Sequence, residues 1–480
     1  MVLKELIPGL NGDFEDFKVK NFTDDSRKIT PGDIFVCIKG PDNDGHDYAQ
    51  KAVDNGAAVI ITERDLGLKN QIIVPDTHKT FGLMCAKEYD FPAKKLDLIG
   101  ITGTNGKTSV SYMVKSILEA AGHKVGLIGT ILYMIGDKTI ESHNTTPGIH
   151  ELNSLLSEMV DNGCDTVVME VSSHALSQRR VEGFHFKRAI FTNLTQDHLD
   201  YHKTMENYLN AKKKLFSICD EAIINLDDAA YGELTKDLSC KITTYSLGNN
   251  ADYSAKSINY LPTGVNYELL GENVLEHIEV STGGKFTVYN SLAAAVCGIS
   301  LGVDSKTVAQ GLKSIKGVKG RAEVVPCDLG FTIIIDYAHT PDGLKNILSA
   351  FNECEKNRLT VVFGCGGDRD KTKRPIMGNI AVHYADNVIV TSDNPRSENP
   401  EAIIEDILVG VKGINTPVKT IVNRPEAIKY AIKTAVKGDI IVLAGKGHET
   451  YQILPTGTIH LDEREVVAEA IEEIKGKKDN

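Results

Sequence analysis

The sequence predicts an α/β protein built mainly on parallel sheets. Short apolar runs bounded by polar or Gly-rich loops, such as 165–171 and 359–363, have the length and composition of buried strands. Between such runs, apolar residues recur at helical spacing, as at Leu152, Leu155 and Met159. Because this alternation of strands and helices continues along the chain, we expect ligands at the carboxyl ends of the strands.

Three blocks of strands and helices divide the 480 residues, a length that exceeds one ordinary core. We predict a small N-terminal α/β domain at 1–96, a central domain with a mostly parallel sheet at 97–325, and a C-terminal Rossmann-like α/β domain at 326–480. The segment 245–288 is rich in strand formers and is expected to form an antiparallel edge. The strand-like runs are 33–38, 58–62, 71–74, 96–101, 124–129, 165–171, 189–192, 331–336, 359–363, 387–391 and 439–443.

The composition is that of a soluble globular protein, with 41% hydrophobic and 25% charged residues. No apolar run reaches membrane-spanning length and the N-terminus is not a secretory signal, so we expect a cytoplasmic protein without membrane insertion. A net charge of −12 argues against broad nucleic-acid binding but permits basic pockets for small anions. The nine cysteines form no C-x-x-C pair, which excludes an obvious zinc site or disulfide framework. We expect a monomer whose partners are small-molecule substrates.

A Gly-rich turn, Thr102-Gly-Thr-Asn-Gly-Lys-Thr108, lies between a predicted strand and a predicted helix. Glycines allow backbone N–H groups to approach phosphate oxygens, and the start of a helix adds partial positive charge. Lys107 can reach the outer phosphates, and the Thr108 hydroxyl is placed for Mg²⁺. Only two residues separate Gly103 from Gly106, so the spacing departs from the strict P-loop pattern. We predict a P-loop-type nucleotide site in the central domain; a plain turn is the alternative.

Polar residues also end two further strands of the central block. Glu170 closes an apolar strand, where a carboxylate can ligate Mg²⁺; a helix-capping or solvated acid is the alternative. His198 lies in a loop after the next strand, and we favour a functional role for it, whereas Asp200 and His202 are left open. Lys212 belongs to a basic helical run, for which a solvated face is the prediction from composition.

Three Gly-rich polar loops follow strands of the third block, at 364–371, 392–396 and 445–449. The carboxyl ends of parallel strands share one edge, so these loops are expected to converge on one rim. The second loop contains Arg396, whose planar guanidinium suits a carboxylate or phosphate, and the third ends in Glu449, which suits a cation. A zwitterionic amino acid would fit such a rim.

Taken together, the loops resemble those of the Mur ligase family, along essentially the whole chain. Any one motif is weak, but the ordered set is specific. The motifs are Asp25-Ser-Arg27, Asp44-Gly-His46, Thr102 to Thr108, Asn144-Thr-Thr-Pro-Gly148, Glu170-Val-Ser-Ser-His-Ala-Leu176, Asn193 to Asp200, Tyr289-Asn290, Gly320-Arg-Ala-Glu323, Asp336-Tyr-Ala-His-Thr-Pro341, Gly366-Gly-Asp-Arg-Asp370, Asp393-Asn-Pro-Arg396 and Gly445-Lys-Gly-His-Glu449.

The resemblance implies an ATP-dependent amide-bond ligase of peptidoglycan precursor synthesis, whose three domains hold the uridine nucleotide substrate, ATP and an amino acid. For ATP it implies Gly103, Thr104, Asn105, Gly106, Lys107, Thr108, Ser109, Asn290, Arg321 and Asp336. For the uridine diphosphate muramoyl peptide it implies Ser26, Asn144, Thr145, Thr146, Ser172, Gln178 and Arg180. For Mg²⁺ it implies Thr108, Glu170, His198 and Lys212. The catalytic residues implied are Lys107, Glu170, His198 and Lys212.

The resemblance also reverses the composition-based interpretation of Lys212. The family has a Tyr-x-x-Ala-Lys motif, matched here from Tyr208 to Lys212, whose lysine reacts with CO₂ to form a carbamate. The carbamate of N6-carboxylysine is an anion that can ligate a second Mg²⁺. The implied reaction proceeds by attack of a D-glutamyl carboxylate on the γ-phosphate of ATP, followed by attack of the incoming amine on the acyl phosphate. We expect the C-terminal domain to close when ligands bind.

Within the family, Asp393-Asn-Pro-Arg396 resembles the signature of members that add meso-diaminopimelate. The chemistry agrees, because that amino acid carries a second carboxylate, which L-lysine lacks and an arginine can pair with. L-lysine is the alternative, and another amino acid a more distant one. The residues implied for this substrate are Arg369, Asp393, Asn394, Pro395, Arg396, Gly445 and Glu449.

Two other functions are alternatives. A folylpolyglutamate-type ligase would share the ATP-binding and C-terminal folds, but does not resemble the first 96 residues. A P-loop NTPase switch or motor would need neither an amino-acid site nor a uridine-nucleotide domain. Dependence of ATP turnover on both a uridine-linked peptide and an amino acid separates these possibilities.

Overall fold

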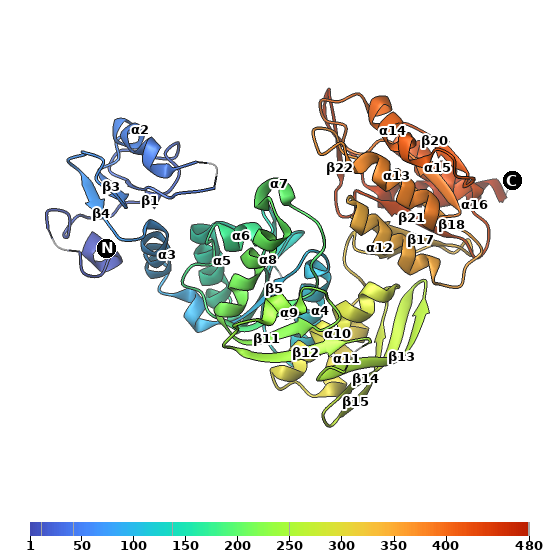
Figure 1. Cartoon of the computed structure of the whole chain (residues 1–480), viewed down its shortest axis with the longest axis horizontal. Coiled ribbons are helices and arrows are strands. Elements are labelled where there is room, and N and C mark those ends of the chain that lie inside the picture. The colour runs from blue at the N-terminus through green and yellow to red at the C-terminus, as the bar shows by residue number, and fades with distance from the viewer. Residues whose placement is uncertain (11, 42, 137, 249, 479–480) are drawn as a thin grey trace.

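The computed structural model describes residues 1–10, 12–41, 43–136, 138–248 and 250–478. Three lobes follow one another along the long axis of the molecule, coloured blue, light blue through green to yellow, and orange to red (Figure 1). Each lobe is built on its own main sheet, and we name them the N-terminal, central and C-terminal lobes. Among the described helices, none combines the length and apolarity needed to cross a bilayer. All nine cysteines are free thiols, as their spacing predicts.

The N-terminal lobe has a four-stranded parallel sheet whose strand order follows the sequence. Its strands are β1 (Phe22–Thr23), β2 (Ile34–Val36), β3 (Val59–Thr62) and β4 (Gln71–Ile73), and its helices are α1 (Leu3–Leu6), α2 (Ala49–Asp54) and α3 (Thr77–Glu88). Helix α3 begins where the Asp76 side chain accepts a hydrogen bond from the Lys79 backbone N–H, a typical N-cap. This lobe contains the three strands predicted before residue 96.

The central lobe contains an eleven-stranded sheet in the order β15-β14-β13-β12-β11-β10-β5-β9-β6-β7-β8. Pairing is parallel from β13 to β6 and antiparallel at both ends, so the predicted antiparallel edge is confirmed. The β7–β8 hairpin at the other edge was not predicted. The strands are β5 (Asp97–Thr102), β6 (Val125–Ile128), β7 (Leu132–Ile135), β8 (Lys138–Glu141), β9 (Thr166–Glu170), β10 (Phe186–Phe191), β11 (Cys219–Asn225), β12 (Lys241–Ser246), β13 (Tyr253–Leu261), β14 (Gly264–Gly271) and β15 (Val274–Val280).

Helices cover both faces of the central sheet. In β5, Ile99 and Ile101 pack into one hydrophobic core, whereas Leu98 packs into the other. Because both faces are buried, the strands read as continuous apolar runs rather than as alternating ones. The helices on the first face are α4 (Lys107–Ala120), α10 (Lys285–Ser300) and α11 (Ser305–Ser314). Those on the side of the second core are α5 (Ile149–Asp161), α6 (Ser173–Ser177), α8 (Met205–Lys213) and α9 (Tyr231–Thr235), with the short α7 (Leu199–His202) before α8.

The C-terminal lobe has a six-stranded sheet in the order β16-β17-β21-β18-β19-β20, parallel except at β16. Its strands are β16 (Glu323–Val325), β17 (Thr332–Asp336), β18 (Leu359–Phe363), β19 (Asn387–Val390), β20 (Val418–Thr420) and β21 (Ile440–Ala444), followed by the hairpin β22 (Tyr451–Leu454) and β23 (Gly457–His460). Its helices are α12 (Pro341–Asn352), α13 (Lys373–Tyr384) and α14 (Pro400–Leu408) over one core and α15 (Arg424–Thr434) and α16 (Glu463–Lys478) over the other. Strands β21, β18 and β19 are neighbours, so the three loops that follow them meet at one edge, as predicted.

Candidate active site

The Gly-rich turn connects β5 to α4 and closes tightly around its own lysine. Nζ of Lys107 donates hydrogen bonds to the carbonyl oxygens of Gly103 and Thr104, both at 2.9 Å. An ammonium has three N–H donors, so one remains for a ligand oxygen. Gly106 caps α4 with a φ of +87°, and a Cβ there would lie 2.4 Å from Oδ1 of Asn290. The loop therefore requires glycine at position 106 for both its conformation and its packing.

Replacing Gly106 with alanine is expected to destabilise the protein by about 1–2 kcal/mol through the positive φ. The added Cβ would also displace Asn290 and misplace the loop, so the KM for ATP should rise about 100-fold. Gly122→Ala is the matched control, because Gly122 has a φ of +90° but no heavy atom within 4 Å of the added Cβ. The two variants should have similar midpoints of thermal unfolding. In steady-state kinetics, only Gly106→Ala should show the higher KM for ATP; equal KM values for the two variants would contradict the prediction.

Thr108 and Glu170 face each other at the start of α4 and the end of β9. The Thr108 hydroxyl donates to Oε2 of Glu170 at 3.1 Å, and the Thr130 hydroxyl donates to the same oxygen at 2.9 Å. The other oxygen, Oε1, accepts the backbone N–H of Thr130 at 2.9 Å. Glu170 is fully buried, and within the described part of the chain it forms no ion pair with lysine or arginine. A buried carboxylate surrounded by hydroxyl oxygens fits a hard cation such as Mg²⁺.

The prediction of a solvated face for Lys212 is wrong. Lys212 is 1% exposed, because α8 turns this residue inward while Lys214 is exposed. Its Nζ donates to the carbonyl oxygen of Gly103 at 2.8 Å and lies 4.3 Å from the centre of the Tyr208 ring. Burial, together with the positive charge of Lys107, holds the pKa of Lys212 well below its usual range. The structure therefore places this amine beside the phosphate loop, in surroundings that favour its neutral form.

His198 is the N-cap residue of α7 and has a left-handed φ of +53°. Its ring is 4.8 Å from that of His174 and 6.2 Å from that of Tyr208, between centroids. Burial lowers the pKa of His198, and burial together with neighbouring histidines lowers the pKa of His174 to about 4. His198 therefore lies beside the Lys212 helix as a ring that favours the neutral, metal-ligating form.

Ser109, Asn290 and Arg321 line one small cavity on the α4 side of the phosphate loop. The Arg321 guanidinium lies 4.8 Å from the centre of the Tyr337 ring, and its buried Nε has no hydrogen-bond partner among the described residues. A buried orphan donor calls for an acceptor from a ligand. Asp336 does not line this cavity; its two carboxylate oxygens accept the backbone N–H groups of Ala322 and Ala338. Asp336 therefore holds the loop that carries Arg321.

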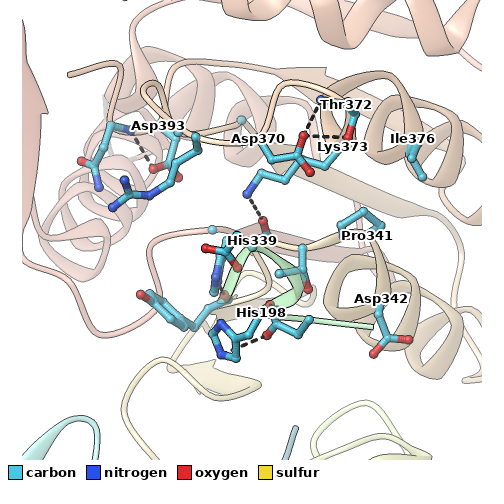
Figure 2. Close-up of a pocket in the computed structure, with 18 of the residues that line it drawn as sticks. His198, His339, Pro341, Asp342, Asp370, Thr372, Lys373, Ile376 and Asp393 are labelled. Atoms are coloured by element: carbon cyan, nitrogen blue, oxygen red, sulfur yellow. Dashed lines mark hydrogen bonds and ion pairs between the residues drawn. The ribbon is translucent and has the colours of Figure 1, made fainter. Parts of the chain in front are cut away.

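A cleft of about 980 Å³ separates the central and C-terminal lobes. The central lobe contributes residues 196–200, including His198, and the C-terminal lobe contributes the loops after β17, β18, β19 and β21. Figure 2 shows His198 in this cleft together with His339, Asp370, Lys373 and Asp393 of the C-terminal lobe. The phosphate loop borders the same region, because Nδ2 of Asn105 donates to Oδ2 of Asp342 at 2.8 Å.

Six of the seven residues predicted for the amino acid line this cleft, and Pro395 does not. Those that do are Arg369, Asp393, Asn394, Arg396, Gly445 and Glu449. Nδ2 of Asn394 donates to Oε2 of Glu449 at 2.9 Å, and Nη1 of Arg396 donates to the Gly367 carbonyl at 2.9 Å. The guanidinium is thus held from behind by a neutral carbonyl, which leaves its charge for a ligand.

A second cavity of about 910 Å³ lies between the N-terminal and central lobes. Asn144, Gln178 and Arg180 line it from the central lobe, opposite Asp25 and Lys39 of the N-terminal lobe. Arg180 donates from Nε and Nη2 to Oε1 of Gln178 at 3.0 and 2.7 Å, which fixes both side chains in place.

Four other residues predicted for the uridine substrate lie outside the lining of this cavity. The Thr146 hydroxyl donates to the Glu170 backbone carbonyl at 2.9 Å. The backbone carbonyl of Thr146 accepts a hydrogen bond from Nη1 of Arg180 at 2.6 Å. Ser172 caps α6, and the Thr145 hydroxyl lies 3.1 Å from that of Thr130. Thr145 and Thr146 therefore connect the cavity to the Glu170 site.

Ser26, in the N-terminal lobe, is buried, and its backbone carbonyl accepts a hydrogen bond from Nδ2 of Asn55.

Sequence reasoning missed three residues that the structure places at these sites. Thr130 binds Glu170 through both its hydroxyl and its backbone N–H, and its position just after β6 was an available signal. Asp342 joins the phosphate loop to α12, and in the sequence it directly follows the motif that ends at Pro341. Lys446 lies inside a quoted motif but was not assigned, because its burial is not visible in the sequence.

Comparison with known proteins gives three family matches in chain order. The model of the Mur ligase family, catalytic domain, matches residues 18–81; that of the Mur ligase middle domain matches 101–298; and that of the Mur ligase, glutamate ligase domain, matches 320–447. The UDP-N-acetylmuramoyl-L-alanyl-D-glutamate--2,6-diaminopimelate ligase 1 of Clostridium acetobutylicum is 50% identical over 463 residues, with 95% of each chain covered. The corresponding ligase of Bacillus velezensis is 47% identical over 478 residues, covering 98% of this chain and 97% of its own.

A solved structure of a UDP-N-acetylmuramoyl-L-alanyl-D-glutamate--2,6-diaminopimelate ligase superposes on this fold with a TM-score of 0.75, at 34% identity over 99% of both chains. The agreement in fold therefore extends through all three lobes. On these matches, the chain belongs to the Mur ligase family.

Proposed function

We propose that this protein is an ATP-dependent ligase that joins meso-diaminopimelate to UDP-N-acetylmuramoyl-L-alanyl-D-glutamate during peptidoglycan precursor synthesis. The observation that carries the proposal is the placement of an arginine-bearing rim, with Arg396 and Glu449, across one cleft from the phosphate-loop region. The names of the relatives at 50% and 47% identity support it. The folylpolyglutamate-type alternative does not account for the N-terminal family match at 18–81. The switch alternative accounts for neither that match nor the amino-acid rim.

Each lobe receives one substrate in this proposal. Residues 1–96 bind the uridine nucleotide, with the muramoyl peptide extending through the cavity at Gln178 and Arg180; residues 97–325 bind ATP; and residues 326–480 bind the amino acid. Both cavities are lined by residues of one chain, so neither needs a partner subunit to be complete, and we propose a monomeric enzyme. Because it uses ATP, we also propose that it acts in the cytoplasm.

In the first step the D-glutamyl carboxylate attacks the γ-phosphorus of ATP, the bond to the bridging oxygen breaks, and ADP leaves. The free N–H of Lys107 donates to the transferred phosphoryl group, and backbone N–H groups at the start of α4 hold the other phosphates. Arg321 offers its unpaired Nε to ATP. Thr108 and Glu170 would hold Mg²⁺, with His198 and carbamylated Lys212 completing the metal sites. The metal would supply charge neutralisation at the phosphates.

In the second step the amine of the amino acid attacks the acyl carbon, and phosphate leaves from the tetrahedral intermediate. Arg396 holds the distal carboxylate, while Asn394 and Glu449 face the polar groups at the same end. Holding three substrates across lobes makes the reaction effectively intramolecular. The contact of Asp342 with Asn105 and with the Thr195 hydroxyl, both at 2.8 Å, joins the C-terminal lobe to the phosphate loop.

Phosphate release tests the proposal directly. Purified protein receives ATP, Mg²⁺ and UDP-N-acetylmuramoyl-L-alanyl-D-glutamate, with meso-diaminopimelate, L-lysine or no amino acid. Release only with meso-diaminopimelate is the expected result. Release with L-lysine would retain the ligase and overturn the substrate, and release independent of either addition would favour an NTPase switch.

Arg396→Met is expected to raise the KM for meso-diaminopimelate about 100-fold, because truncating one member of a charge pair leaves the other unpaired. The KM values for ATP and for the uridine substrate should stay within about twofold, since neither substrate contacts this side chain. Lys412→Met is the control, an exposed cation of the same lobe that does not line the cleft. An unchanged KM for meso-diaminopimelate in Arg396→Met would remove Arg396 from the site.

A further inference from the structure

Lys446 is a fully buried cation directly behind the amino-acid rim. Its side chain is 0% exposed, it follows β21, and it does not itself line the cleft between the central and C-terminal lobes. Nζ donates to Oδ1 of Asn394 at 3.0 Å and to Oε2 of Glu449 at 2.8 Å. Both acceptors do line the cleft. The lysine therefore contacts two rim residues and no open space.

Lys446 is one of two donors that set which way the Asn394 amide faces. Oδ1 of Asn394 accepts both Nζ of Lys446 and the backbone N–H of Ile453, the latter at 3.0 Å. A flipped amide would place its NH₂ group against these two donors, leaving all three without an acceptor. Nδ2 is thus directed to Glu449, and its second N–H has no acceptor among the described residues.

The same lysine determines what Glu449 offers to a ligand. Oε2 of Glu449 is occupied by Nζ of Lys446 and Nδ2 of Asn394. Oε1 receives no hydrogen bond from any residue that the structure describes. The carboxylate is held in place by one oxygen and offers the other, with its charge partly balanced from behind.

We propose that Lys446 is a positioning residue that sets the donor face of Asn394 and the free oxygen of Glu449, and so makes the rim selective for an amino acid whose distal end carries both a carboxylate and an ammonium. This inference rests on the proposed function. A zwitterionic end needs a donor and a balanced acceptor beside Arg396, whereas a lone distal ammonium is attracted by uncompensated negative charge. Removing Lys446 would leave the Glu449 carboxylate without its buried cation and would take away one of the two donors that hold Oδ1 of Asn394.

The test compares wild type, Lys446→Met and Lys446→Arg, using phosphate release with meso-diaminopimelate or L-lysine at saturating ATP and uridine substrate. In Lys446→Met we expect kcat/KM for meso-diaminopimelate to fall about 100-fold, mainly through KM. The kcat/KM for L-lysine should fall by a factor at least ten times smaller. The ratio of kcat/KM for meso-diaminopimelate to that for L-lysine is therefore expected to decrease. Lys446→Arg keeps the positive charge but places it differently. Its kcat/KM for meso-diaminopimelate should lie between those of wild type and Lys446→Met.

A double variant separates positioning from general structural support. If Lys446 acts through Glu449, the loss in Lys446→Met/Glu449→Gln should be clearly smaller than the product of the two single losses. The double variant also removes the uncompensated charge, so it folds even if Lys446→Met does not. Multiplicative losses, or an unchanged amino-acid preference in Lys446→Met, would overturn the role of Lys446. A wild-type enzyme inactive with both amino acids would instead overturn the proposed function.

Discussion

Replacing Lys107 with methionine is expected to lower kcat about 1000-fold, with the fold and the binding of the uridine substrate intact. Lys107 uses two of its three N–H donors to hold the loop carbonyls of Gly103 and Thr104. In the proposed mechanism, the third donor is the one that serves the transferred phosphoryl group, where negative charge must be stabilised in the transition state. Methionine keeps the length of the side chain but supplies neither the charge nor the donor.

Lys115→Met is the control for this variant. Lys115 lies on the same helix, α4, and pairs with Glu119 one turn further on. Loss of such a pair near the surface should change kcat by about twofold at most. Steady-state phosphate release and calorimetric binding of the uridine substrate measure the two properties separately. A kcat for Lys107→Met within tenfold of wild type would mean that this lysine only shapes the loop.

Replacing Lys212 with alanine is expected to lower kcat about 1000-fold as well, because the carbamate that would complete the metal site cannot form. The amine is buried against Tyr208 and the Gly103 carbonyl, with no ion pair to a carboxylate among the described residues. Burial favours the neutral form of the amine, which is the form that reacts with CO₂. Truncation to alanine also opens space beside the phosphate loop, into which a small carboxylate such as acetate can fit.

Partial rescue of Lys212→Ala by added acetate is therefore the specific readout, since a purely structural lysine would not be replaced by an anion. Isotope-labelled bicarbonate should also give a carbamate signal in the NMR spectrum of the wild type and not of the variant. Lys214→Ala is the control, from the same basic run but exposed, and it should retain wild-type activity. Full activity in Lys212→Ala without acetate would contradict the proposed carbamate.

Local sequence patterns were sufficient to predict most strands of the fold. The predicted strand at 165–171 is β9 and the one at 359–363 is β18, because a strand buried on both faces is a nearly continuous apolar run in the sequence. The antiparallel edge was also visible, since β13 to β15 are unusually rich in strand formers. The β7–β8 hairpin was not predicted because both strands are short: β7 alternates between partly buried and buried residues, and β8 is mostly exposed, so neither forms a continuous apolar run.

The sequence by itself determined the order of strands and helices, the phosphate loop, the three polar loops of the C-terminal lobe and the family resemblance. These properties depend on residues that are close together in the chain. Only the tertiary structure decided which lysine of the basic run is buried, because Lys212 and Lys214 differ in what packs against α8 and not in composition. It also decided that Asn105 contacts Asp342 and that Lys446 orients Asn394. Such contacts join residues far apart in the sequence, and their geometry exists only once the sheets and lobes have packed.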